Sequence, residues 1–151
     1  MDVLLRLQEL GLELPKVPPI VGIYKPVKQV GNLLYVSGQG PTVDGIPVIT
    51  GKIGAERTIA EGQEAARICT LNSLSILQDF LGDLNRIKSV VKTLGFVASA
   101  PHFNYQPKVI DGASHLLVQI FGEAGQGARS AVGVSELPFN ISVEIEFLIE
   151  I

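Results

Sequence analysis

The segment from residue 86 to residue 99 constrains the fold most, because it reads as a β-strand with two apolar faces. The alternate residues of one face are Ile87, Val91 and Val97, and those of the other are Val90, Leu94, Phe96 and Ala98. A strand that is apolar on both faces lies inside a sheet that is covered on both sides. The rest of the chain therefore has to supply other strands and two covering layers.

Two helices flank this strand in the sequence. Thr58 and Glu61 form a capping box, which predicts the start of a helix over residues 59–81. Pro107 suits the first position of a second helix, over residues 107–121. Each of the two segments is followed directly by a glycine, which favours the end of a helix there.

The remaining apolar segments read as strands. Residues 27–30 and 33–37 flank the turn-prone pair Gly31-Asn32 and predict a hairpin. Further strands are predicted at residues 46–50, 129–136 and 141–150, the last two as a C-terminal strand pair around residues 137–140. In the last strand the odd-numbered residues are all apolar, so they should share one buried face.

The order of three strands, helix, strand, helix and two strands predicts one α+β domain spanning residues 1–151. Residues 1–23 would form a short helix at 4–10 and a proline-rich extended arm. Two helices can cover only one face of the sheet, so the other face needs a partner. Another copy of the chain is the simplest partner, and we expect a homo-oligomer.

Composition excludes several classes of function. The net charge is -3 and there is no run of basic residues, which argues against a nucleic-acid partner. No apolar run approaches the length needed to cross a membrane. The N-terminus lacks a secretory apolar stretch, and a single cysteine, Cys69, allows no intrachain disulfide. We therefore expect a cytoplasmic protein.

Few residues have the pattern of a catalytic or metal site. His102 and His115 fall in different elements without other ligands at metal-binding spacing, so we expect no metal. Cys69 lies on the apolar face of the long predicted helix, where a buried thiol is unreactive. The glycine pairs 38/40 and 125/127 lack the third glycine of a dinucleotide-binding loop.

Arg129 and Glu144 are the two residues with a chemical interpretation. Arg129 follows a glycine-rich loop and opens a strand, where its guanidinium could hold a carboxylate through two parallel hydrogen bonds. The alternative is a surface ion pair. Glu144 lies in the last strand, opposite the apolar set. If an oligomer buries that face, the pKa of Glu144 could rise towards that of a general base; otherwise the carboxylate is simply solvated.

Two stretches far apart in the chain resemble signatures of one family. Residues 127–138 read GARSAVGVSELP and are followed by VEIE at 143–146, which resembles the C-terminal signature of the Rid/YjgF family of reactive intermediate deaminases. Residues 31–39, GNLLYVSGQ, resemble its N-terminal signature. The resemblance covers the chain from about residue 24 to its end. Residues 62–67 and 112–117, together with the proline-rich arm, resemble a longer branch of that family.

The resemblance implies a chorismate-mutase-like fold, in which a mixed sheet carries two helices on one face. It further implies a homotrimer with a central barrel of sheets and with clefts between subunits. The implied reaction is the hydrolysis of amino-acid-derived enamines and imines, such as 2-aminoacrylate, to 2-keto acids and ammonia. No cofactor is implied, and the partner is a small carboxylate substrate.

Individual residues take roles from the same resemblance. Arg129 matches the arginine that binds the substrate carboxylate, and Glu144 matches the glutamate that holds the attacking water. The pocket-lining positions are matched by Tyr24, Ser37 and Gly38. Ala131 stands where other members often have cysteine, so it offers only backbone groups. The family's asparagine near the start of the second helix is replaced around Pro107, a departure that bears on substrate choice.

Two other functions fit parts of this pattern. A non-catalytic trimer that binds a small carboxylate would use the same arginine and glutamate. An endoribonuclease role has been described for relatives, but the acidic composition and the lack of a basic stripe or a catalytic histidine pair argue against it.

Overall fold

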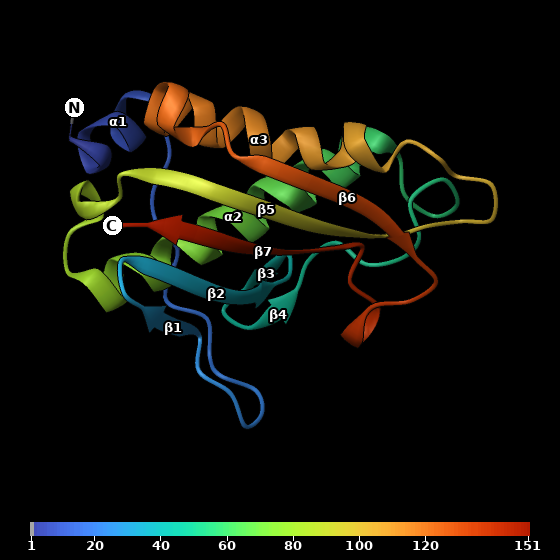
Figure 1. Ribbon diagram of the computed structural model, residues 1–151. Coiled ribbons are helices and arrows are strands. Elements are labelled where there is room, and N and C mark those ends of the chain that lie inside the picture. The colour runs from blue at the N-terminus through green and yellow to red at the C-terminus, as the bar shows by residue number, and fades with distance from the viewer. Residues whose placement is uncertain (1) are drawn as a thin grey trace.

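The computed structural model describes residues 2–151 as a five-stranded mixed sheet with two long helices on one face (Figure 1). The helices are α1 (Val3–Glu9), α2 (Ile59–Leu81) and α3 (Gln106–Phe121), and the short 3-10 helices are η1 (Leu84–Arg86), η2 (Gly122–Gly125) and η3 (Pro138–Asn140). The strands of the sheet are β1 (Val27–Val30), β2 (Leu33–Gln39), β5 (Ser89–Ala98), β6 (Ala128–Val134) and β7 (Val143–Glu150). The predicted α+β class and the placement of both helices on one face are confirmed.

The strand order is β1-β2-β7-β5-β6, with β5 and β6 parallel and the other neighbours antiparallel. The prediction that the two C-terminal strands form a pair is wrong, because β5 lies between them. In the observed register Phe96 of β5 lies beside Glu144 of β7 and beside Val132 of β6. β6 consequently forms one edge of the sheet and β7 lies in its middle.

The predicted third strand at residues 46–50 is largely absent from the sheet. Ile46–Pro47 forms the short strand β4, which pairs with β3 (Thr42–Val43) in a separate two-stranded ribbon, and Thr50 forms an isolated bridge with Ile141. Asp44 and Gly45 both have positive φ and form the tight turn between β3 and β4. Pro47 has no N–H to donate, so it cannot extend the ribbon into a longer ladder.

A bulge in β5 changes which residues share a face. The register with β7 shifts between Val90 and Lys92, so one extra residue is accommodated on β5. Val90 and Val97 therefore both lie buried on the helix-covered side, at 2% and 0% exposed. The prediction that Val90 shares a face with Leu94 and Phe96 is wrong for this reason.

Local sequence signals fix both long helices. Thr58 Oγ1 accepts from the N–H of Glu61 at 3.1 Å, and Glu61 Oε1 accepts from the N–H of Thr58 at 3.0 Å, which confirms the capping box. Gly82 ends α2 with a left-handed φ of 75°. α3 begins one residue before Pro107, at Gln106. Gly112 allows α3 to lie directly against the backbone of Gln63 in α2, where no Cβ would fit.

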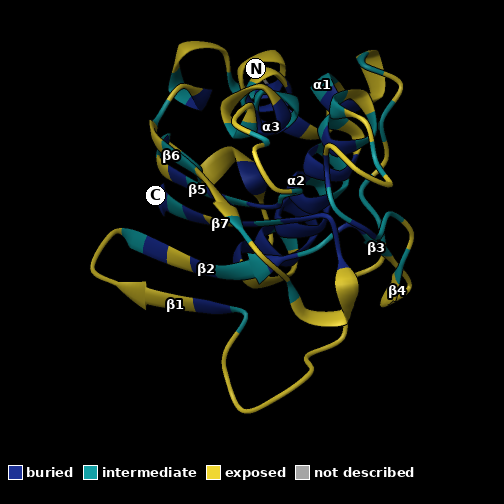
Figure 2. Cartoon of the chain, turned by 90° about the vertical axis from the view of Figure 1, so that its right-hand side faces the viewer, coloured by how far each residue is buried: buried dark blue, intermediate teal, exposed yellow. Residues whose placement is uncertain are grey.

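The core lies between the sheet and the two long helices. The odd-numbered residues from Ile141 to Ile149 are all buried, as the alternation predicts. The opposite face of the sheet has no covering layer within the described residues, and Tyr35 there is 51% exposed. Figure 2 shows a long exposed loop that precedes β1 and extends away from the body of the molecule.

The N-terminal segment is divided between two positions. α1 buries Val3 and Leu7 against its own chain, contacts α3 and η1, and donates a hydrogen bond from Val3 N to Asn85 Oδ1 at 2.9 Å. The following arm crosses α2, where Ser75 Oγ donates to the carbonyl of Pro15 at 2.6 Å. Among residues 2–151 no helix has the length and apolar character to cross a membrane.

Candidate functional site

A groove of about 600 Å³ lies at one end of the sheet, where the N-terminal arm, the end of β2, the β3–β4 ribbon and the start of β7 meet. Four of the six predicted site residues line it together: Tyr24, Ser37, Gly38 and Glu144. Its walls also include several apolar side chains from the arm and from the β6–β7 connection. The groove falls within the range of volumes typical of small-molecule sites, roughly 300–1,000 Å³.

Glu144 forms the acidic floor of this groove. Its side chain is half-buried, and no hydrogen bond or ion pair reaches its carboxylate from any of the residues 2–151. Burial, and secondarily the charge of Glu146, raise the pKa of Glu144. A carboxylate that is partly desolvated and holds no internal donor is a stronger base than a solvated one and can accept a proton from a bound water.

Gly38 makes room for that carboxylate. A Cβ at this position would lie 3.1 Å from Cδ of Glu144 and 3.2 Å from its Oε2. Any side chain would therefore press on the group that the groove presents. The absence of a side chain at residue 38 is thus part of the groove's geometry, and the expected role of Gly38 in lining a substrate pocket stays a prediction.

The neighbouring hydroxyl groups are already engaged. Ser37 Oγ donates to the carbonyl of Lys25 at 2.6 Å and thereby ties the end of β2 to the arm. Tyr24 Oη accepts weakly from the N–H of Val21 at 3.4 Å, and the tyrosine ring is 45% exposed. Ser37 can therefore still accept a hydrogen bond from a ligand, while Tyr24 offers a ring and a hydroxyl at the groove wall.

Phe139 lines the same groove and was missed from the sequence. It is 72% exposed and adopts a positive φ of 58°, as does Asn140 after it. A phenylalanine rarely adopts this conformation, and such strain is concentrated at functional positions. In the sequence, residues 137–140 gave only a turn signal, which says nothing about where the ring points.

Cys69 and the two histidines take no part in the groove. The Cys69 thiol is fully buried beneath β7 and lies 3.6 Å from the carbonyl of Val143. Burial, and secondarily the charge of Glu144, raise the pKa of this thiol well above its usual range, so it remains protonated. His102 and His115 are both exposed. In the described part of the chain no three metal-binding side chains come together.

Arg129 lies elsewhere, in a separate cavity of about 310 Å³ between β6 and α3. Its Nη1 donates to Asp111 Oδ1 at 2.8 Å and to Ser114 Oγ at 3.1 Å. Within one chain Arg129 thus forms the ion pair that the sequence left open as an alternative. Asp111 and Ser114 were not predicted.

The sheet register shows why Arg129 and Glu144 do not meet within one chain. Arg129 lies beside Thr93, whose side chain is buried under the helices, and Ala131 lies beside Gly95 on the same side. Glu144 lies beside Phe96 of β5. Because successive side chains of a strand alternate between the two faces, Phe96 points away from the side of Thr93 and Gly95. Glu144 therefore lies on the open face. The two strands are also two inter-strand spacings apart, about 10 Å. The chain thus carries two halves of the predicted site on opposite faces.

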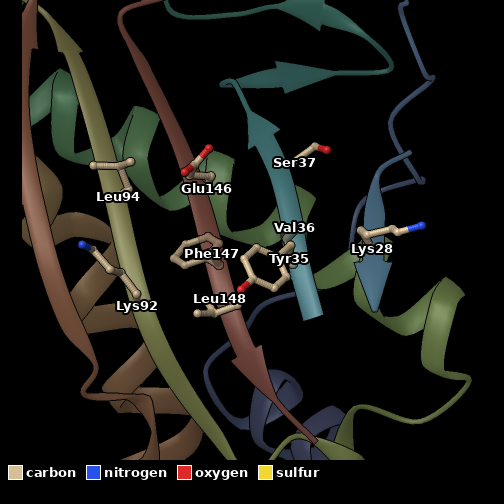
Figure 3. Close-up of a pocket in the computed structure, with 9 residues that line it drawn as sticks. All are labelled: Lys28, Tyr35, Val36, Ser37, Lys92, Leu94, Glu146, Phe147 and Leu148. Atoms are coloured by element: carbon tan, nitrogen blue, oxygen red, sulfur yellow. The ribbon is translucent and has the colours of Figure 1, made fainter. Parts of the chain in front are cut away.

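The open face is hollowed next to the groove. Figure 3 shows Lys92 and Leu94 of β5, Glu146 and Leu148 of β7 and Tyr35 of β2 around a shallow cavity of about 370 Å³. Ser37 and Glu146 line both this cavity and the groove, so the two are adjacent. An uncovered sheet face of this mixed apolar and charged kind is typical of a surface that another protein layer contacts.

Comparison with known proteins assigns the chain to a family. Residues 5–151 match the family described as "YjgF/chorismate_mutase-like, putative endoribonuclease". The chain belongs to the Rid/YjgF family. This confirms the resemblance seen in the two signature stretches. The match extends across almost the whole chain, including most of α1.

Three proteins similar in sequence or structure represent the relatives of this chain. It is 46% identical over 146 residues to Protein TCP17 of Trypanosoma cruzi, covering 96% of this chain and 91% of the relative. It is 31% identical over 138 residues to a 2-iminobutanoate/2-iminopropanoate deaminase of Dermatophagoides farinae, covering 91% and 92%. The crystal structure of a "putative endoribonuclease" from Shewanella oneidensis is 36% identical, covers all of both chains and has a TM-score of 0.96.

Proposed function

We propose that this protein hydrolyses amino-acid-derived enamines and imines to 2-keto acids and ammonia, in a cleft between the subunits of a homotrimer. The observation that carries the proposal is the half-buried carboxylate of Glu144, with a raised pKa and no internal hydrogen-bond donor, above the space left by Gly38. The 31% identical relative described as a 2-iminobutanoate/2-iminopropanoate deaminase supports the substrate class.

The division of the site between two faces of the sheet supports the proposed trimer. Arg129 is on the edge strand β6, and Glu144 is in the groove on the opposite face of the sheet. A second copy that places its β6 edge over the groove of the first would bring one arginine to one glutamate. Three copies related by a closed rotation would repeat this contact without leaving an open edge, and their uncovered faces would form a central barrel. The exposed apolar side chains on that face support such an assembly.

In the proposed reaction Arg129 of one copy holds the substrate carboxylate and draws electron density from the imine carbon. Glu144 of the other copy accepts a proton from water as the oxygen bonds to that carbon. The C=N bond becomes single, and the nitrogen takes up the proton that Glu144 accepted, which gives a carbinolamine and restores the carboxylate. The hydroxyl proton then moves to the nitrogen, the C–N bond breaks, and ammonia leaves the keto group behind. An enamine substrate first tautomerises to the imine. A positioned general base contributes about 10²–10⁴-fold, which suffices for a reaction that already proceeds in water.

An endoribonuclease activity, named for the structural relative from Shewanella oneidensis, has less support from this chain. Glu144 and Glu146 line the groove and would repel phosphates. Both histidines are exposed and neither lines the groove. Retention of single-stranded RNA in a salt-dependent binding assay would favour the nuclease, and no retention would exclude it.

The activity is tested by following keto-acid and ammonia release from enzymatically generated 2-aminoacrylate and 2-iminobutanoate. Wild type should accelerate release, and Arg129→Ala should not. Arg67→Ala is the matched control, since Arg67 also forms a partly exposed ion pair but lies on α2 away from both cavities. Binding of 2-oxobutanoate without any acceleration by wild type would instead indicate a non-catalytic carboxylate-binding trimer.

The shared cleft has its own test. Arg129→Ala and Glu144→Gln should each be inactive alone, but co-expression should form mixed trimers in which some clefts combine an intact arginine with an intact glutamate. Random assembly of a closed ring predicts recovery of about a quarter of wild-type activity. Absence of any recovery in trimers shown to be mixed would show that the two residues do not complement each other across subunits and would refute the intersubunit cleft.

A further inference from the structure

We propose that Asp111 and Ser114 are positioning residues that fix the guanidinium of Arg129 so that its outer edge can receive a substrate carboxylate. The inference rests on the proposed function, because it gives Arg129 a carboxylate to bind. Asp111 Oδ1 and Ser114 Oγ both accept from the same nitrogen, Nη1, at 2.8 and 3.1 Å. No other part of the chain contacts the guanidinium through a hydrogen bond within residues 2–151.

The two contacts use one end of the guanidinium and leave a defined edge. Nη1 carries two N–H donors, and Asp111 and Ser114 provide one acceptor for each. Nε and Nη2 remain, and together they form the side of the guanidinium that binds a carboxylate through two parallel hydrogen bonds. The observed pairing therefore does not compete with a ligand. It holds the fork in one orientation before the ligand arrives.

The positioning groups come from a rigid part of the fold. Asp111 and Ser114 are three residues apart on α3 and so lie on one side of that helix. α3 is itself fixed at this level, because Gly112 lies against the backbone of Gln63 and the side chain of Ile110 covers Gly95 of β5. Groups held by a helix position a site more accurately than groups on a loop. Arg129, at 28% exposed, is sufficiently accessible to reach a ligand at the edge of β6.

The negative charge of Asp111 has a second consequence. It offsets the positive charge of Arg129, so the cavity does not attract anions of every shape through charge alone. Selectivity then depends on the planar two-bond contact, which a carboxylate makes and a halide cannot. The same ion pair would also exist if its only role were to attach α3 to β6. The experiment therefore has to separate orientation of the arginine from structural stability and from charge.

The test compares Asp111→Ala, Asp111→Asn and Ser114→Ala with wild type, in two measurements. The first is the Kd of 2-oxobutanoate by calorimetry, and the second is KM and kcat for 2-iminobutanoate. Asp111→Ala should raise Kd and KM about 10-fold with kcat nearly unchanged, since only orientation for binding is lost. Asp111→Asn keeps an oxygen acceptor for Nη1 and should stay within about 2-fold of wild type. Asp79→Ala, at an exposed aspartate of α2, should change neither quantity.

Each outcome has a clear meaning. An Asp111→Ala variant that binds 2-oxobutanoate as wild type does would overturn the inference, and so would an Asp111→Asn variant as impaired as Asp111→Ala. If Asp111→Ala fails to fold, the Ser114→Ala variant decides. Its expected rise in Kd is about 2- to 3-fold, because the variant loses only the longer of the two hydrogen bonds to Nη1. Wild-type protein that binds 2-oxobutanoate without turnover would refute the deaminase and leave the positioning role measurable. Wild-type protein that does not bind it would refute both.

Discussion

Substitution of Gly38 by alanine is the sharpest probe of the groove, because it should alter the position of Glu144 without disturbing the fold. The added Cβ would lie 3.1 Å from Glu144 Cδ and 3.2 Å from Cγ and Oε2. Ordinary contacts at a Cβ lie at 3.4–4 Å, so the carboxylate has to retreat by about 0.3–0.9 Å. Because the Glu144 side chain is half-exposed, it can make this movement towards solvent.

The expected losses differ between activity and stability. A displacement of up to about 1 Å in a group that orients the attacking water should lower kcat by roughly 10- to 100-fold. Gly38 does not have a positive φ, so alanine causes no backbone strain there. The lower conformational entropy of the unfolded chain contributes about 0.4–1 kcal/mol and offsets the cost of moving the side chain. The free energy of unfolding should therefore change by less than about 1 kcal/mol.

The assay is the pH dependence of kcat/KM together with urea unfolding. In wild type the base is lost as the pH falls through the raised pKa of Glu144. In Gly38→Ala the carboxylate lies closer to solvent, its pKa moves back towards the ordinary value, and the acid limb should shift to lower pH. Unchanged kcat with an unchanged acid limb would refute the assignment of Glu144 as the base. A large drop in unfolding free energy would show that the clash is resolved by the backbone instead.

Three further predictions address Arg129, Glu144 and α1. Arg129→Lys should lose most of the activity with circular dichroism unchanged, because lysine cannot make two parallel bonds to a carboxylate; wild-type kcat/KM in this variant would contradict the clamp. Glu144→Gln should melt above wild type at pH 7. The folded-state pKa of Glu144 is raised, so its ionised form destabilises the fold as the pH rises through that pKa, and the difference should vanish below the ordinary value of 4.5. Leu7→Ala should lower the free energy of unfolding by about 2–4 kcal/mol, since Leu7 is 2% exposed, yet leave kcat unchanged because α1 contacts neither the groove nor Arg129. A lowered kcat in folded Leu7→Ala would show that α1 supports the site.

Elements set by local signals were predictable from the sequence. α2 begins and ends at the predicted residues because the capping box at Thr58 and the glycine at Gly82 act within one helical turn. The hairpin of β1 and β2 likewise depends on the two residues Gly31-Asn32. Which residues of β5 share a face was not predictable in this way, because the bulge in β5 arises from pairing with β7, nearly sixty residues away.

The order of the strands could have been predicted from the sequence, but the predicted pairing of the two C-terminal strands was wrong. A strand, a helix and a second strand in succession predict a parallel pair, and β5, α3 and β6 form such a unit. The predicted C-terminal strand pair, at residues 129–136 and 141–150, rested instead on the rule that a short connection normally joins neighbouring strands. The correct order places β6 at the edge and β7 in the centre, and this difference determines where the two candidate catalytic residues lie.

Four of the six expected site residues lie together, but their functional roles stay a prediction. Glu144, Gly38, Ser37 and Tyr24 do share a groove, although only the resemblance to a family connected them in advance. Asp111 gave no signal as a partner of Arg129, because contacts between a helix and a strand eighteen residues later depend on how the helix lies on the sheet. Phe139 gave none because its unusual φ is imposed by the connection between β6 and β7.

Once the strand order is known, the alternation of side chains between the two faces of the sheet gives the strongest argument about function. Residues on neighbouring strands that share a row point to the same face, so Arg129 in the row of Thr93 and Glu144 in the row of Phe96 necessarily point to opposite faces. No side-chain rotation can bring them together through the sheet. If both act on one substrate, the second copy supplies half of the chemistry, and assembly becomes a condition of activity. Dilution below the dissociation constant of the oligomer should then abolish turnover, even though each chain retains its own core.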